Sequence, residues 1–165
     1  MTGGRPDTSP SVVVHGPGSF TIEERDIVAP GPGEVLVRVA AAGICGSDLE
    51  LFEGTRPAPY VRYPVVPGHE WSGTVAAVGP YVDHLSVGER VVAQGFRNCE
   101  RCARCREGAT NLCSAPYAET GFTHAGAFSG YVTVPARLVH VLAPDADLEA
   151  AALIEPSACV VEGLL

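Results

Sequence analysis

Residues 33–48 read GEVLVRVAAAGICGSD. Apolar and other side chains alternate over residues 34–40, which is the pattern of a strand with one buried face. A turn rich in Gly and Pro precedes this strand, and Cys45 follows it. Ser47 or Asp48 is a suitable N-cap for a short helical turn after the cysteine. The stretch therefore predicts a strand that delivers an isolated cysteine to the start of a short helix.

The rest of the chain also divides into short apolar runs separated by some of its 19 Gly and 14 Pro residues. Further strands are expected over residues 11–15, 20–27, 71–78, 90–93, 128–134 and 138–142, and an Ala- and Leu-rich helix is expected from Leu148 onward. Many short strands with Gly and Pro turns are typical of β-barrels and sandwiches. The expected fold class is mainly β, with residues 1–10 as a flexible tail and residues 11–165 as one domain.

Composition limits the partners and the compartment. The chain is 46% hydrophobic and carries a net charge of −8, which argues against nucleic acid or an anionic membrane as the main partner. The first ten residues lack the apolar core of a signal peptide. No apolar run reaches the roughly 18–20 residues of a membrane span. We therefore expect a cytoplasmic protein, where cysteines bind metals more readily than they form disulfides.

Four of the six cysteines form a compact cluster, Cys99, Cys102, Cys105 and Cys113. A structural zinc ion takes four such thiolates in a tetrahedron, with Zn–S bonds of about 2.3 Å. An iron–sulfur cluster and disulfides are the alternatives. Ferredoxin-type runs usually have a shorter last spacing, followed by a proline. The spacing here favours structural zinc.

A second set of possible ligands combines three residue types. Cys45 ends a strand, and His69 and Glu70 stand together just before the expected strand over 71–78. Thiolate, imidazole and carboxylate are all zinc ligands. A single histidine is more often structural, but this combination favours a metal site. Glu155 precedes a proline and is a further candidate, although a carboxylate is also common at a helix start.

Three motifs, in this order, resemble the N-terminal catalytic domain of the zinc-dependent medium-chain dehydrogenases, which include alcohol, sorbitol and threonine dehydrogenases. The stretch quoted first resembles the family's strand and first catalytic ligand. Gly68-His69-Glu70 with its spaced glycines resembles the zinc signature, and the four-cysteine cluster resembles the structural zinc site. The resemblance runs from about Ser11 to the end of the chain. It implies a GroES-like β-barrel with a zinc-binding lobe and short helices.

The resemblance also implies ligand roles. Cys45 and His69 would hold a catalytic zinc ion, and Glu70 would be a near ligand that exchanges with water or substrate. Glu155 resembles the glutamate that supplies the remaining ligand in the polyol and threonine dehydrogenase branch. The four clustered cysteines would hold the second, structural Zn²⁺.

Three further residues resemble the family's catalytic machinery. Asp48 matches the acidic residue that orients the ligand histidine, and Ser47 matches the hydroxyl that passes the substrate's proton outward. Glu50 stands where many relatives carry a histidine that completes the proton relay. Some sugar dehydrogenases have Glu there too; the alternative is a solvated carboxylate on a helix.

The expected function is that of the zinc-binding domain of an NAD(P)-dependent dehydrogenase that oxidises a secondary alcohol of a polyol, sugar or cyclitol. No Gly-x-Gly-x-x-Gly follows a strand, so the Rossmann domain that binds NAD or NADP is expected only in a full-length enzyme. The 165 residues are expected to be inactive alone. Homo-oligomerisation in the family uses mainly that Rossmann domain. The alternative is a standalone, non-catalytic zinc-binding module.

Overall fold

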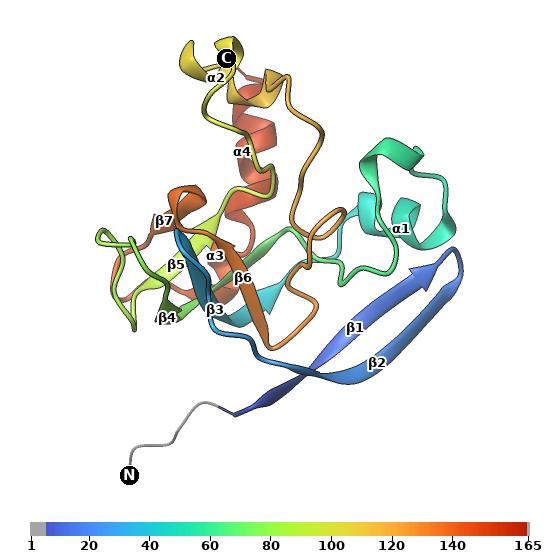
Figure 1. The fold of residues 1–165 in the computed structure, drawn as a ribbon, viewed down its shortest axis with the longest axis horizontal. Helices are drawn as coiled ribbons and strands as arrows, with labels where there is room; N and C mark the ends of the chain where they lie inside the picture. Colours follow the sequence, from blue (N-terminus) through green and yellow to red (C-terminus); the bar gives the residue numbers. More distant parts are fainter. Residues whose placement is uncertain (1–5, 165) are drawn as a thin grey trace.

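A computed structural model describes residues 6–164, which form mainly short strands with a few short helices (Figure 1). The strands are β1 (Thr8–Gly16), β2 (Ser19–Asp26), β3 (Glu34–Ala42), β4 (Trp71–Val78), β5 (Arg90–Ala93), β6 (Tyr131–Pro135) and β7 (Val139–Val141). The helices are α1 (Gly46–Glu53), α2 (Ala103–Arg106), α3 (Leu148–Ala151) and α4 (Ile154–Glu162), with 3-10 turns η1 (Ala58–Tyr60), η2 (Thr110–Leu112) and η3 (Ala136–Leu138). The expected mainly β class is confirmed.

The strands form one five-stranded sheet and one hairpin. The sheet order is β6-β3-β4-β5-β7 with antiparallel neighbours, and β1 and β2 form a separate two-stranded sheet. The bounds predicted for β4 and β5 are confirmed. Strands β6 and β7 end the order without pairing to each other, so the strands of residues 6–164 do not close into a ring.

Two strand starts differ from the expectation by three residues each. Strand β1 begins at Thr8, inside the expected tail, of which residues 1–5 lie outside the described part. Strand β6 begins at Tyr131 rather than at Phe128. The main chain of Phe128 accepts a hydrogen bond from the Val12 amide (2.8 Å), and the Gly130 amide donates to the Ser9 hydroxyl (3.0 Å). Thr8 extends β1 by pairing with Asp26 of β2, whereas the contacts with Val12 and Ser9 join residues 128–130 to β1.

Two apolar clusters make up the core. The larger one lies on the five-stranded sheet and contains Val35, Val37, Trp71, Val75, Leu85, Val91, Ala93, Ala127, Val132, Val134 and Ala136. The smaller one joins β1 and α1 to the connecting loops through Val14, Leu51, Val65 and Phe122. His69 lies between them, because its ring packs 4.9 Å from the ring of Phe122 and its chain leads into Trp71.

A close crossing of two backbones holds the segment before His69. The amides of Gly126, Ala127 and Phe128 donate to the carbonyls of residues 66–68 at 2.7–2.9 Å. Gly68 has a φ of +97°, and a Cβ on Gly121 would lie only 3.0 Å from the Gly68 main chain. Such a conformation and approach need glycine. Gly68 and Gly121 therefore fix the position of the backbone just before His69.

The single helix expected from Leu148 is two helices. Asp147 caps α3 by accepting the amides of Glu149 (2.9 Å) and Ala150 (3.3 Å). A short break follows, and α4 then carries Glu155 and a proline in its first turn, where a missing N–H is tolerated. None of the helices in residues 6–164 is long and apolar enough to cross a bilayer.

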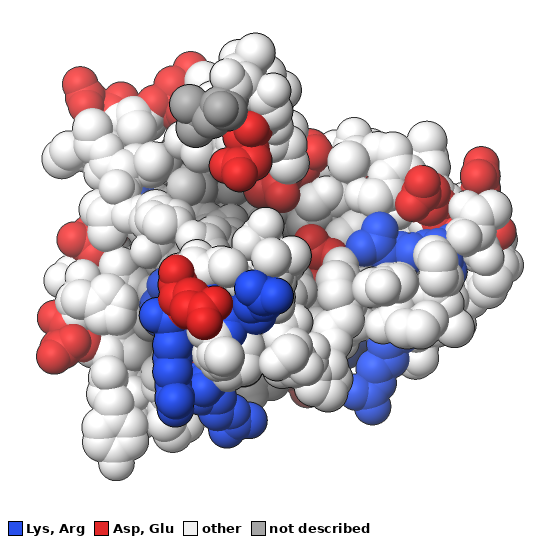
Figure 2. All heavy atoms as spheres, turned by 90° about the horizontal axis from the view of Figure 1, so that it is seen from above, with Lys and Arg blue, Asp and Glu red and all other residues white. Residues whose placement is uncertain are grey.

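The four-cysteine segment and the hairpin lie at different ends of the molecule. Figure 1 shows α2 projecting at the top, whereas the β1–β2 hairpin reaches out toward α1. The face seen from above in Figure 2 carries acidic side chains scattered over it and basic ones in a few groups, on a chain of net charge −8.

Candidate metal centres

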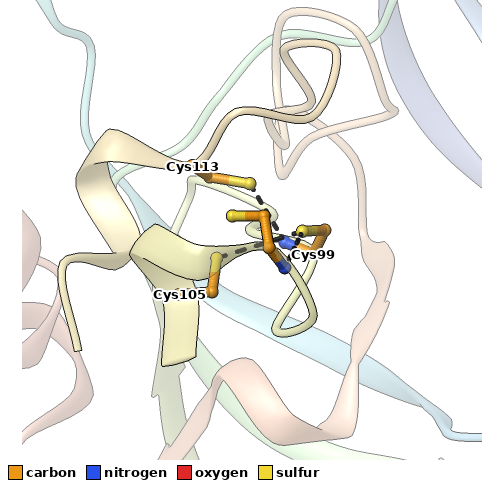
Figure 3. Close-up of side chains that lie close together, drawn as sticks. Cys99, Cys105 and Cys113 are labelled. Carbon is orange, nitrogen blue, oxygen red and sulfur yellow. Dashed lines mark hydrogen bonds between the residues drawn. The ribbon is translucent and has the colours of Figure 1, made fainter. Parts of the chain in front are cut away.

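The four clustered cysteines converge on one point. The sulfur atoms of Cys99, Cys102, Cys105 and Cys113 all lie within 4.8 Å of one another, and three of the side chains are seen pointing together in Figure 3. The Cys99 and Cys105 sulfurs are 4.0 Å apart, too far for a disulfide. Four ligands at about 2.3 Å from a tetrahedral ion would be about 3.8 Å apart. The set, which we call the lobe centre, fits a zinc ion.

Backbone amides already favour thiolates at the lobe centre. The amide of Cys99 donates to the Cys113 sulfur (3.4 Å), and the amide of Cys102 donates to the Cys99 sulfur (3.4 Å). Hydrogen bonds from the amides of Ser114 and Cys105 lower the pKa of Cys102 to about 5. Loss of solvent and the neighbouring sulfurs raise the pKa of Cys105 to about 12. A bound dication would favour the thiolate at all four positions, since metal ligands must be deprotonated.

A second cluster, which we call the mixed centre, joins Cys45, His69 and Glu70. One ligand atom from each residue lies within 4.8 Å of the other two. Cys45 is half-buried at the N-cap of α1, and His69 and Glu70 are only 6% and 9% exposed. Three protein ligands of sulfur, nitrogen and oxygen type suit a zinc ion with a fourth position left for water or substrate. The donor set therefore fits a reactive metal centre.

Asp48 orients the histidine of the mixed centre. Its Oδ1 lies 3.6 Å from His69 Nδ1, and its Oδ2 accepts the Cys45 amide (2.9 Å). Within residues 6–164, Asp48 Oδ1 and His69 Nδ1 are the buried side-chain atoms without a hydrogen bond, and they face each other. Burial lowers the pKa of His69, but the Asp48 carboxylate more than offsets this and raises it to about 9. A proton is thus held on Nδ1, which leaves Nε2 for a metal.

Ser47 and Glu50 lie on the same short helix but at different depths. The Ser47 hydroxyl is 3.5 Å from His69 Nε2, on the side of the ring that faces the mixed centre. The Glu50 side chain is 58% exposed, and its carboxylate lies 4.0 Å from Arg56 Nη1. The structure therefore places Ser47 at the mixed centre and Glu50 at the surface.

Glu155 lies at the edge of the mixed centre. It is half-buried in the first turn of α4, outside the set of atoms that lie within 4.8 Å of one another. Burial raises the pKa of Glu155, the charge of His69 lowers it, and the charge of Glu70 raises it. The carboxylate is therefore close enough to interact with the ligands through its charge.

Four residues near the mixed centre have no signal in the sequence. Arg56 Nη2 donates to the Tyr117 hydroxyl (2.8 Å) and to Glu119 Oε2 (3.3 Å). The Arg56 guanidinium also lies 3.8 Å from the centre of the Phe122 ring, which packs against His69. Arg56 and Glu119 are 63 positions apart, so no spacing rule could have joined them.

Known proteins match this fold and these motifs. The alcohol dehydrogenase GroES-like domain family matches residues 31–145. The erythritol/L-threitol dehydrogenase of Mycolicibacterium smegmatis is 36% identical over an alignment 168 positions long, and the alignment covers 93% of this chain and 46% of that protein.

Two solved structures are similar in fold and sequence. The short chain alcohol dehydrogenase (rspB) of Escherichia coli, complexed with NADH, has a TM-score of 0.84 and 36% identity, over 92% of this chain and 43% of that one. A thermostable alcohol dehydrogenase of Pyrobaculum aerophilum with bound cobalt and zinc has a TM-score of 0.82 and 30% identity, over 90% and 45% of the two chains. The chain thus spans less than half the length of each of these proteins.

Proposed function

Because the chain belongs to the alcohol dehydrogenase GroES-like domain family, we propose that it is the zinc-binding catalytic domain of an NAD(P)-dependent dehydrogenase that oxidises a secondary alcohol of a polyol. The convergence of Cys45, His69 and Glu70 carries the proposal. Three ligands of this kind leave a coordination position open, as catalytic zinc requires. The similarity to an erythritol/L-threitol dehydrogenase supports a polyol substrate.

The lobe centre has a structural role in this proposal. Its four sulfurs would fill all four positions of a tetrahedral zinc ion, so a substrate would find no free position there. Between Cys99 and Cys113 the secondary structure consists of one four-residue helix and one 3-10 turn. A metal ion would therefore supply most of the cross-linking that holds this segment in shape.

At the mixed centre, the protein's residues would bind the metal, orient its histidine ligand and carry away the substrate's proton. A zinc ion bound there supplies a Lewis acid that lowers the pKa of an alcohol hydroxyl, as it does for water. Asp48 keeps His69 in the tautomer that presents Nε2. The Ser47 hydroxyl, 3.5 Å from Nε2, would accept the substrate's proton and pass its own proton onward.

Two carboxylates take supporting roles in the proposal. Glu155 would approach the mixed centre from α4 and complete its ligands, since burial raises the pKa of Glu155 and a bound cation would favour its charged form. Glu50 would receive the proton from Ser47 and release it, because it lies one helical turn further on and is 58% exposed.

The compartment and the partners follow from the same chemistry. Both centres need reduced cysteines, and all six thiols are free, which supports a reducing compartment, the cytoplasm. The net charge of −8 disfavours a nucleic acid partner. The partner would then be a small alcohol.

Metal analysis tests the two centres. The purified chain should bind two zinc ions, one at each centre, and His69→Ala should bind one. The replacement removes a ligand of the mixed centre without touching the lobe centre, because the two sets share no residue. One zinc ion in the unaltered chain, or two in the variant, would contradict the assignment.

A chimaera tests the reaction itself. This chain would replace the matching segment of the Mycolicibacterium smegmatis erythritol/L-threitol dehydrogenase, which shares 36% of its residues, and the formation of NAD(P)H would be followed in absorbance. We expect oxidation of polyols that is lost with His69→Ala. A folded chimaera that binds zinc at both centres but oxidises no alcohol would favour the non-catalytic zinc-binding module instead.

A further inference from the structure

Glu119 is a buried carboxylate on the wall of a cleft. Its side chain is 15% exposed. The cleft has a volume of about 730 Å³. Its lining includes three aromatic residues, Tyr60, Phe96 and Tyr117, besides Glu119, and it also reaches Cys113 of the lobe centre. A cleft with apolar walls and a single charged group is the common form of a binding site for a small molecule.

Glu119 lies beside the mixed centre. A Cβ on Gly95 would lie 3.4 Å from Glu119 Oε1 and 3.6 Å from His69 Cβ, so these two atoms flank the same glycine. Burial raises the pKa of Glu119, while the charges of His69 and Arg56 lower it. The carboxylate therefore shares one electrostatic environment with the metal-binding histidine.

One carboxylate oxygen of Glu119 accepts hydrogen bonds from the protein, and the other accepts none from the described residues. Oε2 accepts hydrogen bonds from the Tyr117 hydroxyl and from Arg56 Nη2. Arg56 is itself fixed, because its Nε donates to the Tyr60 carbonyl (3.0 Å) and its guanidinium lies 3.8 Å from the centre of the Phe122 ring. Among the described residues, nothing donates a hydrogen bond to Oε1. A rigid, charged acceptor is thus presented next to the mixed centre.

We propose that Glu119 Oε1 accepts a hydrogen bond from a second hydroxyl of the substrate, and that it thereby selects polyhydroxylated chains over alcohols with one hydroxyl. The inference rests on the proposed function of the mixed centre, where the first hydroxyl binds. The rings of Tyr60, Phe96 and Tyr117 suit the C–H groups of the carbon chain. A monohydric alcohol would leave Oε1 without the partner that water had provided.

The expected preference for a polyol over a monohydric alcohol follows from the strength of a hydrogen bond to a carboxylate. A hydrogen bond to a charged group contributes enough to change affinity by about 10- to 100-fold. Erythritol and 2-butanol are a matched pair of ligands, since both have four carbons and a secondary hydroxyl. Erythritol should therefore bind at least about tenfold more tightly than 2-butanol.

Cobalt in the mixed centre gives a readout that does not depend on turnover. The 165-residue chain would be loaded with zinc at the lobe centre and Co²⁺ at the mixed centre, and each alcohol would be titrated while the cobalt absorption is recorded. Glu119→Ala should reduce the preference for erythritol about tenfold or more. Glu119→Gln keeps the volume beside Arg56 and should reduce the preference as well. Glu107→Gln alters an exposed carboxylate of the lobe and should leave it unchanged.

The outcomes separate this inference from the proposed function. Absence of cobalt absorption from the mixed centre would refute the metal assignment, and with it both proposals. Intact cobalt spectra with no preference for erythritol in the unaltered chain would overturn the role of Glu119 alone. An unchanged preference in both Glu119 variants would do the same.

Discussion

Replacement of Asp48 by Asn should lower the pKa of His69 well below its value of about 9. Burial lowers the pKa of this histidine, and the Asp48 carboxylate is the strongest group that opposes burial, ahead of Cys45 and Glu155. Asn has nearly the same shape and keeps an oxygen that can accept the Cys45 amide, now 2.9 Å from Asp48 Oδ2. The substitution therefore removes a charge and leaves the helix start in place.

The free energy involved can be worked from the size of the shift. The rise from 6.5 to about 9 corresponds to roughly 3 kcal/mol at 1.36 kcal/mol per pKa unit. Since the pKa is higher in the folded state, the pair stabilises the metal-free centre fully below pH 6.5 and loses this effect as pH rises through 9. The free energy of unfolding should fall over that window, and Asp48→Asn should remove the fall.

Two measurements check the prediction in a chain with zinc at the lobe centre only. NMR titration of the His69 ring gives its pKa, and denaturant unfolding at both ends of the pH window gives the stability. The matched control is Asp83→Asn, because Asp83 Oδ1 also lies 3.6 Å from a histidine Nδ1 but its side chain is 99% exposed. The reasoning fails if His69 titrates near 6.5 in the unaltered chain, or stays near 9 in Asp48→Asn.

Three further predictions concern the two centres. Gly43→Ala should weaken metal binding at the mixed centre by about 10- to 100-fold, because the added Cβ would lie 2.6 Å from Glu70 Oε2. Chelator competition measures the affinity. An unchanged affinity would exclude Glu70 as a ligand. Cys102→Ser should release the zinc of the lobe centre and lower the melting temperature, whereas zinc retained with full affinity would contradict a four-sulfur centre. Zinc affinity at the mixed centre should rise about tenfold per pH unit toward pH 9, because His69 must lose a proton to bind the metal. Isothermal titration calorimetry in buffers of different ionisation heat would detect the released proton. If no proton is released, the result would count against the raised pKa of His69.

Local patterns were enough to predict the bounds of two strands of the sheet, β4 and β5. The bounds of β4 and β5 match the prediction, because their β-branched runs end at glycines or polar turns that also end the pairing. The start of β6 could not be predicted in this way. Its preceding residues are equally strand-like, and tertiary contacts such as the bond from the Val12 amide to the Phe128 carbonyl show that they pair with β1.

At the mixed centre too, local patterns predicted one part of the structure and tertiary contacts determined the other. The residue types of Cys45, His69 and Glu70 identify metal ligands without a structure, because few combinations of side chains bind zinc. Their convergence within 4.8 Å depends on the backbone crossing at Gly68, which no local pattern describes.

By itself, the sequence determined the strand-rich class, the two ligand sets and the resemblance to a dehydrogenase family. These features depend on residue type and on neighbours only a few positions away, so they can be read along the chain. Only the tertiary structure decided that Glu50 lies at the surface beside Arg56 and that Glu119 and His69 flank the same glycine. Those contacts come from packing between segments far apart in sequence, where burial and charge, rather than spacing, set each side chain's role.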